Sequence, residues 1–214
     1  MKTTGNLNLA LIFLFLTTCF SCSKENENEL PTFSKEILYY YGDSIVHLDI
    51  NPQMILVAFN EADYSKNQAI MTLEQYSEID LEKSTIENHY RTYISLKSGI
   101  TETEYLKLLK RLNSIASVYY ATPSFFTDGG IGFLTNKFFI KSAMTETDFD
   151  EFIADNSSKF TMEKEYSSGN LLFTVNKIED GFDAMNLANE INVLDGIDYS
   201  SPSFSYLLDQ MENE

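Results

Sequence analysis

The side chains best suited to acid–base or metal chemistry at neutral pH are two histidines, His47 and His89. His47 stands between Val46 and Leu48 in an apolar stretch, and His89 opens a second strand-like stretch. Neither histidine has a partner residue at the spacing that zinc sites use. We therefore interpret both as structural or surface residues.

Three carboxylates, Asp148, Asp150 and Glu151, fall within one helical turn and carry the oxygen ligands that calcium prefers. The aspartate-rich, glycine-turned loop of calcium sites is absent, and a helix N-terminus favours acidic residues in any case. Other carboxylate pairs are so frequent that no pair stands out as a general acid and base. We expect no metal site and no cofactor.

Known catalytic motifs are also missing from the chain. The sequence contains no phosphate-binding loop, dinucleotide fingerprint, His-Glu-x-x-His motif or nucleophile elbow. This predicts a protein that is not an enzyme, with an unfamiliar catalytic site as the open alternative.

The N-terminal residues 1–21 predict export. Lys2 precedes an apolar run over residues 7–20, which is shorter than the ~20 apolar residues of a membrane-spanning helix. The run ends at Ser21-Cys22, and the segment resembles a bacterial lipoprotein signal peptide in which Cys22 is the lipid attachment site. Cys19 is the competing site, and an ordinary secretion signal or an uncleaved anchor is the alternative.

Residues 22–36 form an acidic tether in this interpretation. Their start, Ser23-Lys24-Glu25, is similar to the lysine-then-acidic export signal of surface lipoproteins in Bacteroidetes-like bacteria. The resemblance implies palmitate on Cys22, a location on the outer face of the outer membrane, and membrane contact through the lipid anchor only. A plain solvated linker would have the same composition.

Charge excludes one class of partner. The chain has a net charge of −17, and removal of residues 1–21 takes away one lysine and no acid, which leaves −18. Phosphate backbones would repel such a chain, so we expect no nucleic acid partner. A hydrophobic content of 43% predicts a packed globule, and acylation of Cys22 would leave no cysteine pair for a disulfide.

The sequence contains an internal repeat. Thr122-Pro123-Ser124-Phe125 returns as Ser201-Pro202-Ser203-Phe204, each time after tyrosine and at the end of the same order of strand and helix signals. Two copies of about 80 residues, with Asp128-Gly129-Gly130 between them, indicate two small modules.

Periodicity predicts the elements of each copy. Thr101 and Glu104 have capping-box spacing and precede an apolar stripe over residues 105–112, which is typical of a helix. The matching helix covers 184–194 after an Asp180 cap, and another begins at 145–148. Its counterpart at 62–72 has a poor apolar stripe and is doubtful. Alternating runs at 92–96 and 171–175 predict strands, Met54 to Phe59 and Phe138 to Ala143 predict the first strand of each copy, and Gly42-Asp43 predicts a hairpin turn.

These elements give each copy the order β-α-β-β-α-β, a ferredoxin-like split unit. We expect an α+β protein with an N-terminal hairpin and two tandem modules of this kind, over residues 37–127 and 128–208, followed by a tail at 209–214.

The two copies resemble the prodomains of subtilisin-like proteases. The strand Phe138-Phe139-Ile140-Lys141, the helix at 184–194 and the closing Asp198-Tyr199-Ser200-Ser201-Pro202 carry this likeness, and Tyr39-Tyr40-Tyr41-Gly42 is similar to the segment after the signal peptide in surface subtilases. The protease domain has no counterpart here, because neither His47 nor His89 lies in a subtilase-like motif.

The resemblance implies a non-catalytic inhibitor, chaperone or docking partner of a subtilisin-like protease. The segment that would enter a protease cleft contains Tyr206, Leu207 and Leu208, and an edge strand or frayed end is the simpler interpretation. The alternative function is a surface binding module for glycan or host protein, in which tyrosines 39–41, 119, 120 and 199 would line a binding face. A decayed relic of a subtilase is a third possibility.

Overall fold

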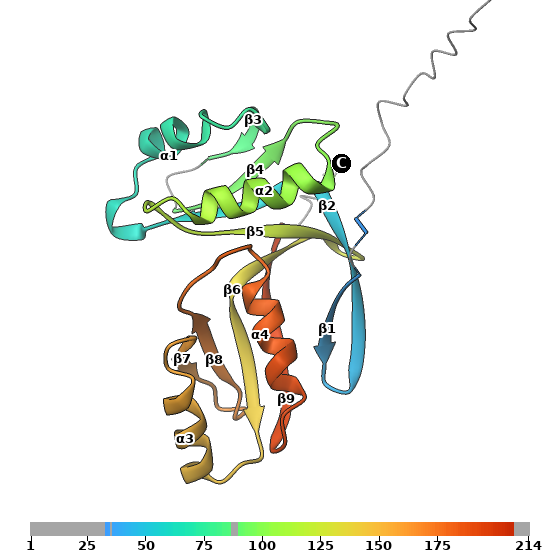
Figure 1. The fold of residues 1–214 in the computed structure, drawn as a ribbon, viewed down its shortest axis with the longest axis vertical. Helices are drawn as coiled ribbons and strands as arrows, with labels where there is room; N and C mark the ends of the chain where they lie inside the picture. Colours follow the sequence, from blue (N-terminus) through green and yellow to red (C-terminus); the bar gives the residue numbers. More distant parts are fainter. Residues whose placement is uncertain (1–32, 35, 87–89, 208–214) are drawn as a thin grey trace, which may run out of the picture.

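The computed structural model describes residues 33, 34, 36–86 and 90–207 (Figure 1). Within these residues the chain forms one antiparallel sheet of nine strands and four α-helices. The expectation of a mixed α+β fold is therefore confirmed.

The elements follow one another in two similar series. The first half, residues 37–127, contains β1 (Ile37–Tyr41), β2 (Ser44–Phe59), the short 3-10 helix η1 (Glu61–Asp63), α1 (Lys66–Leu73), β3 (Ile79–Thr85), β4 (Arg91–Leu96), α2 (Glu102–Asn113) and β5 (Val118–Thr127). The second half, residues 128–207, contains β6 (Gly130–Ser142), α3 (Glu146–Asp155), β7 (Phe160–Glu165), β8 (Leu171–Val175), α4 (Asp183–Asn192) and β9 (Ile197–Leu207).

The strands of each half are arranged in the same order. In the first half the order across the sheet is β3-β4-β2-β5, and in the second it is β7-β8-β6-β9. Pairing of β5 with β6 over Ser124↔Phe133 to Thr127↔Gly130 joins the two sets into one sheet. β1 pairs with the start of β2 as the predicted hairpin, with Tyr41 opposite Ser44.

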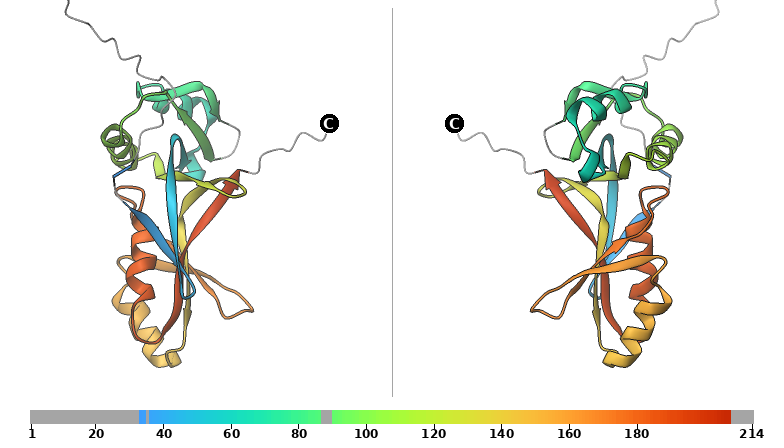
Figure 2. Two further views of the ribbon diagram at one scale, coloured as in Figure 1. Left: turned by 90° about the vertical axis from the view of Figure 1, so that its right-hand side faces the viewer. Right: turned by 90° about the vertical axis from the view of Figure 1, so that its left-hand side faces the viewer.

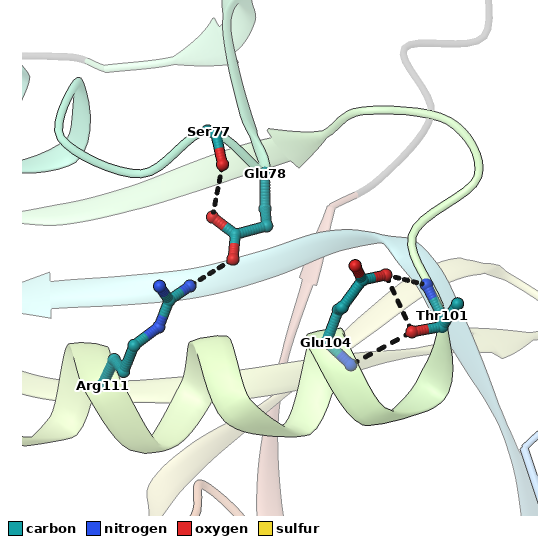
Figure 3. A network of polar contacts seen from close by, with 5 residues as sticks. All are labelled: Ser77, Glu78, Thr101, Glu104 and Arg111. Carbon is teal, nitrogen blue, oxygen red and sulfur yellow. Dashed lines mark hydrogen bonds and ion pairs between the residues drawn. The ribbon is translucent and has the colours of Figure 1, made fainter.

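Helix α2 forms as its sequence predicts. The Thr101 hydroxyl accepts a hydrogen bond from the Glu104 amide at 3.3 Å, and the Glu104 carboxylate accepts one from the Thr101 amide at 2.9 Å (Figure 3). The apolar stripe is buried against the sheet and consists of Tyr105, Leu108, Leu109 and Leu112. On the outer side Arg111 forms an ion pair with Glu78, the residue before β3, and so ties the helix to that strand (Figure 3).

Four elements differ from the sequence expectations. Helix α1 exists in spite of its poor stripe, because Ser65 caps it and Ala69 and Leu73 are enough to hold it on the sheet. Helix α4 begins at Asp183, and Asp180 accepts a hydrogen bond from the Phe182 amide instead of acting as the N-cap. The first strands, β2 and β6, are also much longer than the segments predicted for them.

The strands β5 and β9 continue through their prolines, Pro123 and Pro202. Opposite Pro123, β2 shifts register between Asn51 and Ile55, and opposite Pro202, β6 shifts between Leu134 and Phe138. A bulge tolerates proline because the ladder is already interrupted there and one missing amide costs little.

Two clusters of buried side chains form the core. Each cluster contains residues from both halves of the chain, which meet at the boundary 127/128. Leu134, Phe182 and Met185 of the second half belong to the cluster under α1 and α2. Leu56, Ala58 and Tyr120 of the first half belong to the cluster under α3 and α4. Figure 1 shows most of the second half on the side of β5 away from α2, while Phe182 and Met185 at the start of α4 reach the cluster under α2.

The β1–β2 hairpin, residues 37–48, is an arm that reaches from the first half to the second. It runs beside α4 and β9 (Figures 1 and 2), where the Asn189 side-chain amide donates a hydrogen bond to the Leu38 carbonyl at 2.9 Å. The halves are thus linked by the sheet, by shared core residues and by this arm. No helix in the described ranges has both the length and the apolar character needed to cross a membrane.

Candidate functional site

The residues predicted to contact a protease lie at the end of the described chain. Tyr206 and Leu207 belong to β9, where they pair with Gly132 and Ile131 of β6. Cys22, the predicted lipid attachment site, and Leu208 lie outside the described residues.

Gly132, which lies beneath the Tyr206 ring, positions that side chain. A β-carbon at Gly132 would lie 3.2 Å from Tyr206 Cε1 and 3.2 Å from Thr127 Cγ2, so the Tyr206 ring covers backbone that only glycine leaves open. Tyr206 is nevertheless 53% exposed. Among the described strands β9 pairs only with β6, so its other edge has no strand partner there.

The predicted tyrosine face is not one surface. Tyr120 is fully buried, Tyr39 packs on Phe204 with ring centroids 5.3 Å apart, and the Tyr199 hydroxyl donates to Asn170 at 2.6 Å. Tyr41 is 71% exposed at the tip of the arm, and Tyr119 is 47% exposed at the start of β5. These residues serve the core, the arm and a groove separately.

His47 and Asp148, the latter from the predicted acidic cluster, take part in local structural contacts. His47 contacts Glu36 at 2.8 Å on the surface, and His89 lies outside the described residues. Asp148 accepts a hydrogen bond from the Thr145 hydroxyl at 2.7 Å and so belongs to the cap of α3. Among the residues that the structure describes, no group of three or more His, Cys, Asp or Glu side chains is placed to hold a metal ion.

A groove of about 560 Å³ lies between the two halves. The first half contributes residues from the starts of β4 and β5 and from η1, and the second half contributes residues from β6, β7 and β8. Its polar and aromatic lining includes Tyr90, Arg91, Tyr119, Asn136, Lys137 and Glu163. The volume lies within the range of small-molecule sites.

The register shift in β6 places Asn136 in this groove. The shift spans Leu134 to Phe138, and the Thr135 hydroxyl accepts a hydrogen bond from the Lys137 amide at 3.2 Å, which fixes the bulge. Asn136 is only 1% exposed, and neither its Oδ1 nor its Nδ2 has a hydrogen-bond partner among the described residues. A buried amide without partners costs free energy, so this one calls for an explanation.

On the side of the groove that the second half forms, the charged side chains pair with one another. Lys137 Nζ lies 2.6 Å from Glu163 Oε1, and the Thr174 hydroxyl donates to Glu163 Oε2 at 2.8 Å. Burial alone would raise the pKa of the Glu163 carboxyl, but these two hydrogen bonds and the charges of Lys137 and Arg91 outweigh burial and lower it. Glu163 is therefore a carboxylate at neutral pH and an acceptor of hydrogen bonds.

On the side of the groove that the first half forms, aromatic rings support the lining side chains. The Arg91 guanidinium lies over the Tyr90 ring at 5.4 Å, and the ring of Tyr119 contacts that of Tyr120 with centroids 5.6 Å apart. Burial raises the pKa of Tyr120 to about 12, in spite of the nearby charge of Arg91. Tyr119 thus presents an exposed ring whose inner neighbour is fixed in the core.

No known protein-family model and no curated protein sequence matches this chain. The site therefore has to be interpreted from its own residues. Sequence reasoning named Tyr119 among the tyrosines but missed Asn136, which stands in a polar Thr135-Asn136-Lys137 stretch without a recognisable motif.

Proposed function

We propose that the chain is a non-catalytic surface lipoprotein made of two tandem ferredoxin-like, prodomain-like modules, and that it acts by binding a subtilisin-like protease. Inhibition, chaperoning and docking are the three forms that this contact would take.

The strand order of the two halves supports the modules. Each half places its second, third, first and fourth strands side by side, with helices between the first and second and between the third and fourth. A split β-α-β unit has this strand order, which supports the proposed modules. Corresponding residues also recur 79 positions apart: Asn113 accepts a hydrogen bond from the Ala121 amide at 2.7 Å, and Asn192 accepts one from the Ser200 amide at 2.7 Å. We infer that the halves arose by duplication.

The end of β9 is the observation that carries the proposed contact. Its last residues are held in an extended conformation by β6 on one side, and Tyr206 is fixed by Gly132 with half of its surface exposed. An extended chain with a free edge binds a cleft by backbone hydrogen bonds, while alternate side chains fill pockets. A preformed strand loses little conformational entropy on binding, which favours affinity.

An inhibition assay tests this function. The soluble chain without residues 1–22 would be incubated with a subtilisin-like protease from the same cell, and the residual cleavage of a small chromogenic peptide would be measured. We expect a saturable change in activity and a complex that elutes as one species in size-exclusion chromatography. Tyr206→Ala should weaken the complex, whereas Tyr41→Ala, which removes an even more exposed tyrosine at the tip of the arm, should not.

Unchanged proteolysis at high molar excess, together with no complex in chromatography, would remove the protease from the proposal. Equal effects of Tyr206→Ala and Tyr41→Ala would place the contact elsewhere than β9.

The anchor is a separate part of the proposal and has its own test. Cells that express the full chain would be labelled with palmitate, with Cys22→Ser and Cys19→Ser as a matched pair. We expect Cys22→Ser to abolish the label and Cys19→Ser to retain it. Loss of the label only in Cys19→Ser would move the attachment site, and loss in neither would remove the anchor.

A further inference from the structure

The groove between the halves contains a buried polar side chain that the fold itself does not use. Asn136 is 1% exposed and has a donor group and an acceptor group without partners among the described residues. Most buried polar groups are paired, because an unpaired one loses its water without compensation. A ligand that offers both an acceptor and a donor would supply the missing partners.

The rest of the lining narrows the chemistry of that ligand. Tyr119 offers an exposed ring on one side, and Glu163 and Thr174 offer oxygen atoms on the other. Apolar side chains are few among the lining residues, since only Met162 and Val175 contribute. An apolar ligand would leave the Asn136 amide unpaired, so the lining favours a ligand rich in hydroxyl groups.

Charge excludes a strongly anionic ligand. Lys137 already pairs with Glu163, and Arg91 lies over the Tyr90 ring, so neither cation stands isolated for a phosphate or sulfate. The chain as a whole carries −17, which repels polyanions at a distance.

We infer that the groove between β4, β5, β6, β7 and β8 is a binding site for a neutral saccharide. The Tyr119 ring stacks on the apolar face of a sugar ring. The Asn136 amide donates to one sugar hydroxyl and accepts from another, and the Glu163 carboxylate accepts from a neighbouring hydroxyl. This site is distinct from the end of β9 and does not depend on a protease partner.

Isothermal titration calorimetry on the soluble chain without residues 1–22 tests the inference. The probes are cellotriose, maltotriose, mannotriose, xylotriose, chitotriose and N-acetyllactosamine as neutral saccharides, and trigalacturonate as an acidic one. We expect at least one neutral saccharide to bind with a Kd of about 1 mM or tighter. Tyr119→Ala and Asn136→Leu should each weaken that binding by about tenfold or more.

Two controls separate a binding role from a structural one. Asn136→Leu should leave the thermal unfolding midpoint unchanged or raise it, because an apolar side chain of similar shape removes an unpaired buried amide. Tyr206→Ala is the control, since it removes an exposed tyrosine outside the groove and should leave saccharide binding unchanged while it weakens protease binding.

Three results would overturn the inference. The first is the absence of saturable binding by every neutral probe. The second is binding that survives both Tyr119→Ala and Asn136→Leu, which would place the site elsewhere. The third is binding of trigalacturonate alone, which would contradict the assignment of a neutral ligand. If Asn136→Leu fails to fold, Tyr119→Ala decides the outcome together with Tyr119→Phe, which keeps the ring and should bind normally.

Discussion

The rings of Phe125 and Phe204, which end the two Pro-Ser-Phe sequences, meet edge to face with centroids 6.1 Å apart and planes at 83°. Tyr39 of the arm packs on Phe204 from another direction at 5.3 Å. The repeated motif therefore places two corresponding side chains of the two halves in direct contact, next to the residues that bring the arm across.

Truncation of these two rings should be costly and coupled. Phe125 is fully buried, so Phe125→Ala should lower the free energy of unfolding by about 3–5 kcal/mol. Phe204 is partly exposed, and Phe204→Ala should cost less. A double-mutant cycle in urea should give a coupling energy of about 0.5–1.5 kcal/mol for the ring pair. Strictly additive losses would show that the contact contributes nothing beyond burial.

The cap of α2 should make stability depend on pH. Hydrogen bonds from the Thr101 amide and hydroxyl lower the pKa of Glu104 below its ordinary value of 4.5. A carboxyl with a lowered pKa in the folded state stabilises the fold above pH 4.5, and this stabilisation is lost as the pH falls through the folded-state value.

Thr101→Ala should therefore lower the free energy of unfolding at pH 7 by about 1 kcal/mol. It should also flatten the fall in stability below pH 4.5. Thr103→Ala is the control, because Thr103 is an exposed threonine two residues after Thr101. It should change neither the free energy of unfolding at pH 7 nor its fall below pH 4.5. An equal effect of the two substitutions in urea unfolding at several pH values would contradict the role of the cap.

Two buried tyrosines should respond oppositely to loss of the hydroxyl. Tyr105 donates to the Met54 carbonyl at 3.3 Å, so Tyr105→Phe should cost about 1 kcal/mol. The Tyr120 hydroxyl has no hydrogen-bond partner among the described residues, so Tyr120→Phe should be neutral or stabilise by up to about 1 kcal/mol. Chemical denaturation of both variants at neutral pH measures the difference.

Alkaline titration gives a second test of Tyr120. Its folded-state pKa of about 12 exceeds the ordinary 10.0, so the unfolded chain ionises first and stability falls as the pH rises from 10.0 towards 12. In Tyr120→Phe this fall should be shallower. A fall of unchanged slope would mean that the hydroxyl is solvated.

Gly181 and Gly169 form a matched pair that probes the contact between the halves. Both have positive φ, +89° and +78°. A β-carbon at Gly181 would lie 2.7 Å from the Ala121 carbonyl oxygen on β5, whereas at Gly169 nothing lies within 4 Å. Gly169→Ala should cost only the backbone strain of about 1–2 kcal/mol. Gly181→Ala should cost clearly more, because backbone has to move, and equal thermal midpoints for the two variants would contradict this.

Local signals in the sequence were sufficient for most elements. The capping box and the stripe at 105–112 predicted α2, since both depend on residues within two turns of one another. The β1–β2 hairpin followed from its glycine turn in the same way. Helix α1 has a weaker local signal, because only Ala69 and Leu73 among its residues are fully buried.

The features that could not be predicted from the sequence, namely the position of the arm and the groove, depend on contacts between residues far apart in the chain. The arm is held by Asn189 on Leu38, 151 positions away, and no local pattern encodes that hydrogen bond. Asn136 reads as an ordinary polar residue in a strand, and only the register shift opposite Pro202 buries it. The groove was missed for this reason, because it exists only once the halves are packed.

The exchange of core residues across the turn at 128–129 has a consequence for a protein that is proposed to meet proteases. Asp128 and Gly129 are exposed, so this turn is open to cleavage. A cut there would break one covalent bond while the β5–β6 ladder, the arm and the interlocked side chains stay in place. The nicked chain would persist as a tight heterodimer of its own fragments and would keep its shape and its ability to bind a partner.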